Sequence, residues 1–343
     1  MLICSIYISS FCSHSYSLFA IRYSFFVIRY FPVSQKIKKM SKDFIIKAAI
    51  ATGFDACGIA RAEALTEDAE FMQSWLAEGK HGDMEYLARN FEKRTDPRVL
   101  VPGCKSVVVV LLNYYPEQKQ SDELPKIAKY AYSAVDYHTV MKTKLQALEN
   151  KIIAEYGDDC VAKDYQHSFS DSAPVLEKRW AQKAGLGWLG RHSQLIHPNA
   201  GSYFFIGILM LNIDIEPSEA PFPFRCGTCT KCIDACPTGA LSSEGMDARK
   251  CISYLTLESK SEIPDDLKNK LSGCIVGCDI CNDVCPWNKR FAKPHQHKEL
   301  SPTEEIFHWT RDDWKTVTKE QFDEVFRKSA VKRAKLDRIK KNL

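Results

Sequence analysis

Several features that would place a protein in a simple class are missing from this sequence. A membrane-spanning helix needs a run of ~18 apolar residues, but the most hydrophobic segment, YSLFAIRYSFFVIRYF, is interrupted by Arg22 and Arg29. There is no internal repeat and no Gly-x-Gly-x-x-Gly loop after a strand, which argues against a repeat protein and a dinucleotide-binding unit. Neither charge dominates, because 47 Lys and Arg face 43 Asp and Glu. The net charge of +4 therefore identifies no class of partner.

The first 39 residues also lack the marks of a secretory signal. Positive charges interrupt their apolar part, and no small-residue cleavage site follows. Met40-Ser41-Lys42-Asp43 is typical of an ordinary start, followed by an amphipathic helix that Gly53 would end. We therefore expect residues 1–39 to come from an upstream start codon or to form a disordered extension. A mitochondrial-type presequence, which is basic and has no acidic residue, is the alternative.

Residues 40–215 mix helices and strands. Strands are predicted at 54–60, 107–112 and 202–212, and the uniformly apolar second one is expected to be buried on both faces. Helices are predicted at 137–156, ended by Gly157, and at 175–184, opened by Pro174. These elements predict an α/β or α+β domain with a substantial core. Three prolines within residues 216–224 then indicate a linker.

Cysteine, in contrast, is abundant. Of fourteen cysteines, nine lie within residues 226–285. In a chain of 343 residues, such clustering favours metal ligation over a disulfide framework, and a reducing compartment. Cys226, Cys229, Cys232 and Cys236 are spaced C-x2-C-x2-C-x3-C and precede Pro237. This spacing is typical of a [4Fe–4S] ferredoxin in which the fourth cysteine ligates a second cluster.

A second, shorter run completes the pattern, with the spacing C-x2-C-x3-C and Pro286 after it. The predicted ligands are Cys226, Cys229, Cys232 and Cys285 for one cluster, and Cys236, Cys251, Cys278 and Cys281 for the other. We prefer Cys251 to Cys274, because Cys274 is one residue out of register whereas Cys251 lies in an intervening segment that could return to the cluster. A pair of Cys4 zinc sites is the alternative, which the tight first triple of cysteines disfavours.

Four segments together resemble the epoxyqueuosine reductase family: AYSAVDYH (131–138), DSAPVLEKRWAQKAGLGWLG (171–190), KCISYLTLE (250–258) and GCDICNDVCPWN (277–288). The resemblance extends from about Met40 to the C-terminus. It departs from the family where Gly190-Arg191-His192 replaces the usual Gly-Lys-Asn. It implies a cobalamin-dependent iron–sulfur enzyme that reduces epoxyqueuosine to queuosine at the wobble position of tRNA.

The resemblance also implies an architecture. An N-terminal α/β cobalamin-binding catalytic domain (40–215) would precede a ferredoxin-like domain with two [4Fe–4S] clusters (216–292). A short, basic helical tail (293–343) would follow. The fold class expected for the chain as a whole is α+β.

Removal of an epoxide oxygen calls for an acid, because an alkoxide leaves poorly unless it is protonated. The family match gives Asp171 this role, although an Asp before a helix is ordinarily a helix cap. The match also implies five cofactor-binding residues, which are Asp136, Asp171, Arg94, His197 and Ser253. Of these, Arg94, His197 and Ser253 are the weaker candidates. His138 is not expected to ligate cobalt, because the chain lacks the Asp-x-His-x-x-Gly pattern of such sites.

The end of the chain is strongly basic. Between Arg327 and Leu343, eight Lys or Arg face a single acidic residue, Asp337. Since the resemblance implies a tRNA substrate, we expect these cations to neutralise phosphates, although most charge runs are solvated helix faces. We further expect an external electron donor, a monomer, a cytoplasmic location and no membrane association.

Three other functions compete with this interpretation. A reductive dehalogenase pairs the same cofactors, but such enzymes typically carry a twin-arginine signal, and no Arg-Arg pair occurs in the first 60 residues. A ferredoxin-type electron carrier would not need a domain of ~175 residues beside its clusters. A zinc-stapled RNA-binding protein would hold neither iron nor cobalt.

Overall fold

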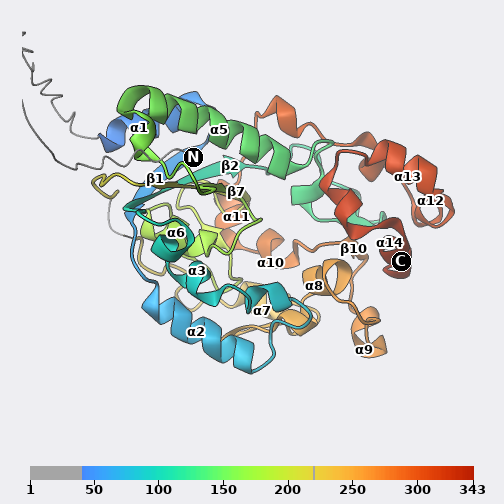
Figure 1. Cartoon of the computed structure of the whole chain (residues 1–343). Helices are drawn as coiled ribbons and strands as arrows, with labels where there is room; N and C mark the ends of the chain where they lie inside the picture. The colour runs from blue at the N-terminus through green and yellow to red at the C-terminus, as the bar shows by residue number, and fades with distance from the viewer. Residues whose placement is uncertain (1–40, 219–220) are drawn as a thin grey trace, which may run out of the picture. The chain divides into compact units, whose positions relative to one another are not determined.

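The centre of the protein is a four-stranded antiparallel sheet with the strand order β1-β2-β7-β4 (Figure 1). It is seen in a computed structural model that describes residues 41–218 and 221–343. The strands of this sheet are β1 (Ala56–Arg61), β2 (Ser106–Asn113), β4 (Ser168–Phe169) and β7 (Phe204–Leu211). In the register of the sheet, Val109 of β2 lies opposite Gly58 of β1 and Ile208 of β7. The three predicted strands are therefore confirmed, each to within two residues.

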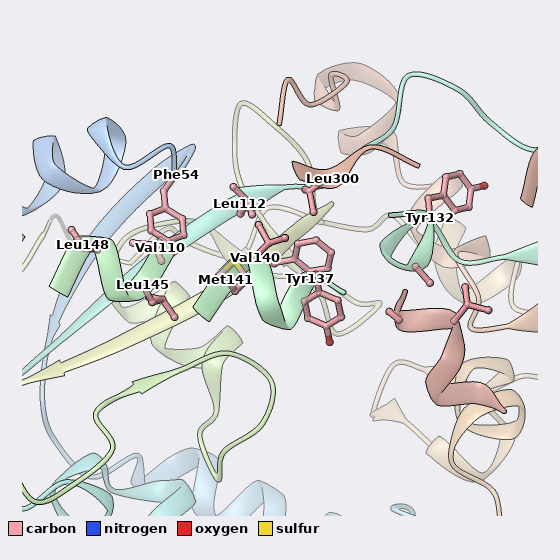
Figure 2. Close-up of a cluster of buried hydrophobic side chains, with 14 of the residues drawn as sticks. Phe54, Val110, Leu112, Tyr132, Tyr137, Val140, Met141, Leu145, Leu148 and Leu300 are labelled. Atoms are coloured by element: carbon pink, nitrogen blue, oxygen red, sulfur yellow. The ribbon is translucent and has the colours of Figure 1, made fainter. Parts of the chain in front are cut away.

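Both faces of the sheet are covered, which explains the uniform apolar run in β2. Because side chains alternate along a strand, Val108, Val110 and Leu112 pack with α1 (Lys42–Ala51) and α5 (Tyr137–Tyr156) in one cluster. Their neighbours Val107, Val109 and Leu111 pack with α6 (Glu177–Lys183) in another. Figure 2 shows the first cluster, with Val140, Met141 and Leu145 of α5 close to Val110 and Leu112. The prediction that this strand is buried on both faces is confirmed.

The helix ends follow local sequence rules in two of three cases. α5 has the predicted bounds and ends at Gly157, whose φ of 85° is the left-handed conformation that glycine adopts readily. α1 ends just before Gly53, which has a φ of 92°. The helix predicted at 175–184 is wrong at its start. It begins at Glu177, so Pro174 lies in the preceding loop and does not open it.

The remaining elements are short and lie mostly in the C-terminal half. The other helices are α2 (Thr66–Ala77), α3 (Phe91–Thr95), α4 (Pro97–Leu100), α7 (Lys231–Asp234), α8 (Ile252–Leu257), α9 (Asp265–Lys268), α10 (Ile280–Asp283), α11 (Pro286–Phe291), α12 (Arg311–Thr316), α13 (Lys319–Val325) and α14 (Leu336–Lys341). The other strands are β3 (Lys126–Ile127), β5 (Trp188–Leu189), β6 (Leu195–Ile196), β8 (Leu241–Ser242), β9 (Gly245–Met246) and β10 (Cys274–Val276). Within residues 41–218 and 221–343, seven short 3-10 segments connect them.

The basic C-terminal segment (293–343) is helical, as predicted, but it is also part of the core. Trp314, Phe326, Val331 and Ile339 are fully buried in the same cluster as the inner face of α5. Asn342 is buried too, and its side-chain amide donates hydrogen bonds to the carbonyls of Thr256 and Ile275. The cations of this segment therefore project from a backbone that the fold holds in place.

Two expectations concern other parts of the chain. Residues 1–39, predicted to be an extension or a presequence, lie outside the described residues. Among the residues that are described, none of the helices combines the length and the apolar character needed to cross a membrane.

Candidate active site

Asp171 lies in the loop between β4 and α6, and this loop holds it in an unusual backbone conformation. Its φ is 58°, in the left-handed region that Asp and Asn enter more readily than most residues. Its backbone N–H donates to Oε1 of Glu177, in the first turn of α6, at 2.5 Å. The residue at the helix cap is Leu176, and no side chain caps this end. Asp171 is therefore not a helix cap, and its carboxylate is free for other contacts.

Those contacts come from the start of α5 and from the C-terminal segment. The hydroxyl of Tyr137 donates to Oδ2 of Asp171 at 2.5 Å, and Nε2 of His138 lies 3.5 Å from the same oxygen. Nδ1 of His138 lies 2.7 Å from Oδ1 of Asp136. A guanidinium nitrogen of Arg333 lies 4.0 Å from Oδ2 of Asp171. Asp136, His138 and Asp171 therefore form a continuous chain of polar contacts.

Asp136 has a structural role in addition. Its Oδ1 accepts the backbone N–H of His138 at 2.9 Å, which makes it the N-cap of α5. It does not line the cavity described below. The structure thus brings Asp136 next to Asp171 through the imidazole of His138, and not by direct contact.

The electrostatics of this chain favour a proton on the imidazole. Hydrogen bonds to Asp136 and then to Asp171 raise the pKa of His138 to about 9. Burial raises the pKa of Asp171, but the hydrogen bonds from His138 and Tyr137 outweigh it and hold the pKa below its ordinary value. Burial, and next the charge of Asp171, raise the pKa of Glu177 to about 8. Near pH 7 the carboxylate of Asp171 is therefore ionised, whereas its neighbours His138 and Glu177 both carry a proton.

A cavity of about 350 Å³ opens in front of Asp171. Its wall includes Ser253 of α8 and Cys278, a predicted cluster ligand. The other lining residues are Tyr86, Tyr114, Tyr130, Tyr137, Ser170, Glu177, Lys178, Gln194, Phe204, Phe205, Ile206, Leu257, Glu258, Asp279, Asn282 and Arg333. A molecule in this cavity would contact Asp171 and the neighbourhood of an iron–sulfur cluster at once.

The first set of predicted cluster ligands surrounds a second cavity. Cys226, Cys229, Cys232 and Cys285 all line this space of about 140 Å³, together with Arg191, His192, Pro286 and Trp287. Cys232 belongs to α7, whereas Cys285 precedes α11, so two distant segments supply the four thiols. Four cysteines around one cavity can supply the donor set that a [4Fe–4S] cubane requires.

The second set of predicted cluster ligands is Cys236, Cys251, Cys278 and Cys281, and its members have different neighbours. Cys281 interacts electrostatically with Cys251, Cys232 and Cys236, and burial followed by the charge of Cys251 raises the pKa of Cys281 to about 12. Cys274 in β10 contacts Cys278 instead, and a hydrogen bond between their thiols lowers the pKa of Cys274. Both candidates for the eighth ligand therefore lie close to the second set, and Cys251 is the one near Cys236 and Cys281.

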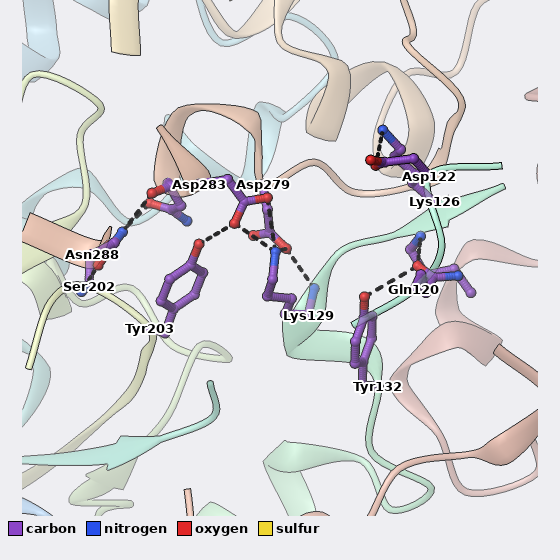
Figure 3. Close-up of polar contacts among 12 residues, drawn as sticks. Gln120, Asp122, Lys126, Lys129, Tyr132, Ser202, Tyr203, Asp279, Asp283 and Asn288 are labelled. Atoms are coloured by element: carbon purple, nitrogen blue, oxygen red, sulfur yellow. Dashed lines mark hydrogen bonds and ion pairs between the residues drawn. The ribbon is translucent and has the colours of Figure 1, made fainter. Parts of the chain in front are cut away.

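A partly buried polar network joins this cysteine-rich segment to the central sheet (Figure 3). Lys129 donates to Asp283 at 2.7 Å and lies 3.6 Å from Asp279, the residue after Cys278. The hydroxyl of Tyr203, just before β7, donates to Asp283 at 2.5 Å. Burial disfavours the charge on Lys129, but the two carboxylates outweigh it and raise its pKa. The network fixes the cluster segment against the strand that lines the cavity.

The remaining predicted residues lie in different places. Ser253 lines the cavity. Arg94, in α3, is buried and donates to the carbonyl of Tyr86, whose side chain is part of the cavity wall. His197 lies near Phe204, which also lines the cavity. Neither Arg94 nor His197 lines it directly.

Sequence reasoning missed four groups around Asp171. Tyr137 and His138 stand directly after Asp136 within AYSAVDYH, so their place in that segment was a usable signal. Glu177 likewise lies within DSAPVLEKRWAQKAGLGWLG, six residues after Asp171, and binds its backbone N–H locally. Arg333 gave no such signal, because it reaches Asp171 only through the packing of the C-terminal segment into the same core as α5.

Comparisons with known proteins identify relatives of this chain. Residues 94–172 match the family model described as epoxyqueuosine reductase QueG, DUF1730, and residues 225–288 match the 4Fe-4S double cluster binding domain. The epoxyqueuosine reductase of Leadbetterella byssophila is 49% identical, over 86% of this chain and 94% of that protein. The one of Cellulophaga algicola is 45% identical, over 89% of this chain and 98% of that protein.

Solved structures show the same similarity. A crystal structure of epoxyqueuosine reductase with an epoxyqueuosine-modified tRNA-Tyr stem loop matches with a TM-score of 0.77 and 28% identity, covering 88% of this chain and 79% of that one. The Bacillus subtilis enzyme, with its catalytic aspartate loop swung out of the active site, matches with a TM-score of 0.76 at 28% identity and the same coverage. From its motifs, its fold and the extent of these matches, the chain belongs to the epoxyqueuosine reductase family.

Proposed function

We propose that this chain reduces epoxyqueuosine to queuosine in tRNA, and that the reaction takes place in the cavity between Asp171 and Cys278. One observation carries the proposal: a single cavity is lined both by a carboxylate that lies 3.5 Å from an imidazole nitrogen and by a predicted cluster ligand. The reaction needs such a pairing. It consumes two electrons and two protons, converts the epoxide to an alkene, and releases the oxygen as water.

The proton route starts at His138. Nε2 of His138 holds a proton near pH 7 and faces Oδ2 of Asp171, so the carboxyl group of Asp171 can be protonated there and pass the proton to the departing oxygen. The hydroxyl of Tyr137 binds the same oxygen of Asp171 and orients the carboxyl group. In the Bacillus subtilis relative, an aspartate loop is described as catalytic, which supports this role for Asp171.

The cavity wall is suited to a corrin. It is apolar at Phe204 and Ile206 of β7 and polar at Ser170, Ser253 and Asn282, which matches a macrocycle that carries amide side chains. The family is cobalamin-dependent, and cobalamin, when bound, supplies a strongly reducing cobalt for the two-electron step. Ser253 would contact it directly. We assign Arg94 and His197 an indirect part, in which they support Tyr86 and Phe204. Asp136 acts through His138.

Two [4Fe–4S] clusters belong to the family's double-cluster domain. We propose the ligands Cys226, Cys229, Cys232 and Cys285 for the first cluster, and Cys236, Cys251, Cys278 and Cys281 for the second. The second is the one next to the active cavity, because Cys278 lines that cavity. Clusters, when bound, pass electrons one at a time from an external donor, which we expect to meet the protein near the first cluster.

The tRNA is the remaining partner. A relative has been crystallised with a modified tRNA stem loop. In this chain, Arg333 extends from the basic C-terminal segment to the cavity and pairs with Glu258 on its wall. This places positive charge beside the entrance that an anticodon base would use. An unstacked base would have to enter the cavity, as is usual when chemistry is done on a base. We further propose a cytoplasmic monomer organised as the domains 40–215, 216–292 and 293–343.

The test is turnover of a defined substrate. Anaerobically purified protein, loaded with cobalamin and supplied with a low-potential chemical reductant, should convert epoxyqueuosine in tRNA to queuosine, measured by mass spectrometry of the released nucleosides. Asp171→Asn should abolish most of this conversion, whereas Asp164→Asn, at an exposed carboxylate in a nearby loop, should not. Equal turnover in both variants would contradict the proposed site.

A further inference from the structure

His192 is held in the turn between β5 and β6 and is almost fully buried, with 3% of its surface exposed. The turn is rigid, because Gly190 donates to the carbonyl of Gln194 at 2.9 Å and Ser193 donates to that of Gly190. His192 lines the same small cavity as the four thiols proposed to hold the first cluster. His192 therefore borders the space that the cluster would occupy.

The hydrogen bonding of the ring fixes which nitrogen carries the proton. The backbone N–H of Gln194 donates to Nδ1 at 3.2 Å, so Nδ1 must present a lone pair. A ring with an unprotonated Nδ1 carries its hydrogen on Nε2. Within residues 41–218 and 221–343, Nε2 is buried and has no hydrogen-bond partner. The turn thus presents an unused N–H donor inside the protein, a costly arrangement unless an acceptor is present.

The side chains that line this cavity offer few acceptors other than sulfur. Besides His192 and the four cysteines, its wall consists of Arg191, Pro286 and Trp287. The guanidinium and the indole are donors only, and proline has no polar side-chain atom. Thiolate and sulfide sulfur atoms are the acceptors that a bound cluster would add to this space.

We infer that Nε2–H of His192 donates a hydrogen bond to the sulfur of the cluster held by Cys226, Cys229, Cys232 and Cys285, and thereby raises its reduction potential. This inference rests on the ligand set proposed above. A hydrogen bond to sulfur stabilises the more negative, reduced form of a cluster, so it shifts the potential upward. His192 is then a positioning residue for electron entry, in a turn where the family usually has Asn.

The test is a redox titration of the anaerobic, cluster-loaded protein, followed by electron paramagnetic resonance. His192→Phe keeps a ring of similar size and removes the donor. We expect one of the two clusters to become about tenfold harder to reduce, a downward shift of about 59 mV for one electron. The other cluster serves as an internal control and should keep its potential. His192→Asn, which restores an N–H donor, should lie closer to the wild type.

A second measurement identifies the hydrogen bond itself. In the wild type, the reduced first cluster should show a hyperfine coupling to an exchangeable proton, which disappears in D2O and in His192→Phe. Unchanged potentials and an unchanged coupling in a variant that holds about eight iron would overturn the inference. If His192→Phe loses iron, the same measurements should be made on His192→Met. Its side chain is slimmer and also lacks a hydrogen-bond donor, so the same result is expected. An error in the proposed ligand set would appear in a different experiment. Cys285→Ser would then lose the second cluster instead of the first.

Discussion

The hydroxyl of Tyr137 donates a hydrogen bond to Oδ2 of Asp171, and Nε2 of His138 approaches the same oxygen from the next residue of the chain. Two consecutive side chains at the start of α5 therefore converge on one oxygen of a carboxylate in another loop. The other oxygen is left free of both, on the residue that lines the active cavity. This arrangement makes Asp171 an oriented proton carrier and leads to the first two predictions.

Asp171→Asn should abolish proton delivery while it preserves the loop. Asn enters the left-handed conformation as readily as Asp, so the backbone at φ 58° should survive. Loss of a positioned general acid typically lowers a rate ~100- to 10,000-fold. Single-turnover conversion of epoxyqueuosine should fall by that amount, with iron content, cobalamin content and tRNA affinity unchanged. Near wild-type turnover would transfer the role to another group, with Asp136 the next candidate.

Turnover should decline as the pH rises through about 9, where His138 loses its proton. The sign follows from the cause: hydrogen bonds to Asp136 and Asp171 raise this pKa, so the protonated, active form persists below about pH 9 and is lost above it. Asp136→Asn removes the largest cause but keeps a good helix cap. The alkaline limb of the pH–rate profile should then move toward pH 6.5, the ordinary value. A profile identical to that of wild type would exclude His138 as the proton source.

Cysteine substitutions should separate the two clusters. Anaerobic protein should hold about eight iron per chain, as two cubanes require. Cys285→Ser should damage the cluster of Cys226, Cys229 and Cys232, because all four thiols line one cavity. Cys251→Ser should damage the other cluster, and Cys274→Ser, its matched control, should be nearly silent. Iron analysis with electron paramagnetic resonance distinguishes these outcomes, and a damaged cluster in Cys274→Ser alone would exchange the roles of the two residues.

The exposed cations of the C-terminal segment should contribute to tRNA binding. Truncation after Phe326 would remove the buried Val331 and Ile339, so substitution is the cleaner test. Changing Arg327, Lys328 and Lys341 to Gln should weaken binding and flatten its dependence on salt, by about 0.7–0.9 in log–log slope for each lost phosphate contact. The same change at Lys47, Lys142 and Lys151, exposed on α1 and α5, is the control. Equal effects of both sets of substitutions would mean that the segment contributes only general solubilising charge and no specific tRNA contact.

Asn342 should matter for stability although it lies next to the end of the chain. Its amide satisfies the buried carbonyls of Thr256 and Ile275. Asn342→Ala leaves both without a donor and should cost about 1–3 kcal/mol, seen as a lower urea midpoint. Asn150→Ala, at an exposed position on α5, should change stability by less than about 0.5 kcal/mol. An unchanged midpoint in Asn342→Ala would mean that water replaces the amide at no cost.

The sequence by itself determined whatever depends on local spacing. The continuous apolar run of residues 107–112 indicated a strand buried on both faces, and the helical periodicity up to Gly157 indicated α5. The spacing of the cysteines indicated two clusters, because the fourth cysteine of a C-x2-C-x2-C-x3-C run binds a different cluster from the first three. Features formed by residues that are close in the sequence can therefore be predicted from the sequence itself.

Tertiary structure alone decided how the active cavity is assembled. Asp171 looked like the cap of a helix opened by Pro174, yet α6 starts later and the loop turns Asp171 toward Tyr137 and His138. Arg333 reaches that site because the apolar face of the C-terminal segment packs into the same core as α5. Contacts of this kind depend on which surfaces bury each other, and burial is a property of the whole folded chain that no short stretch of sequence encodes.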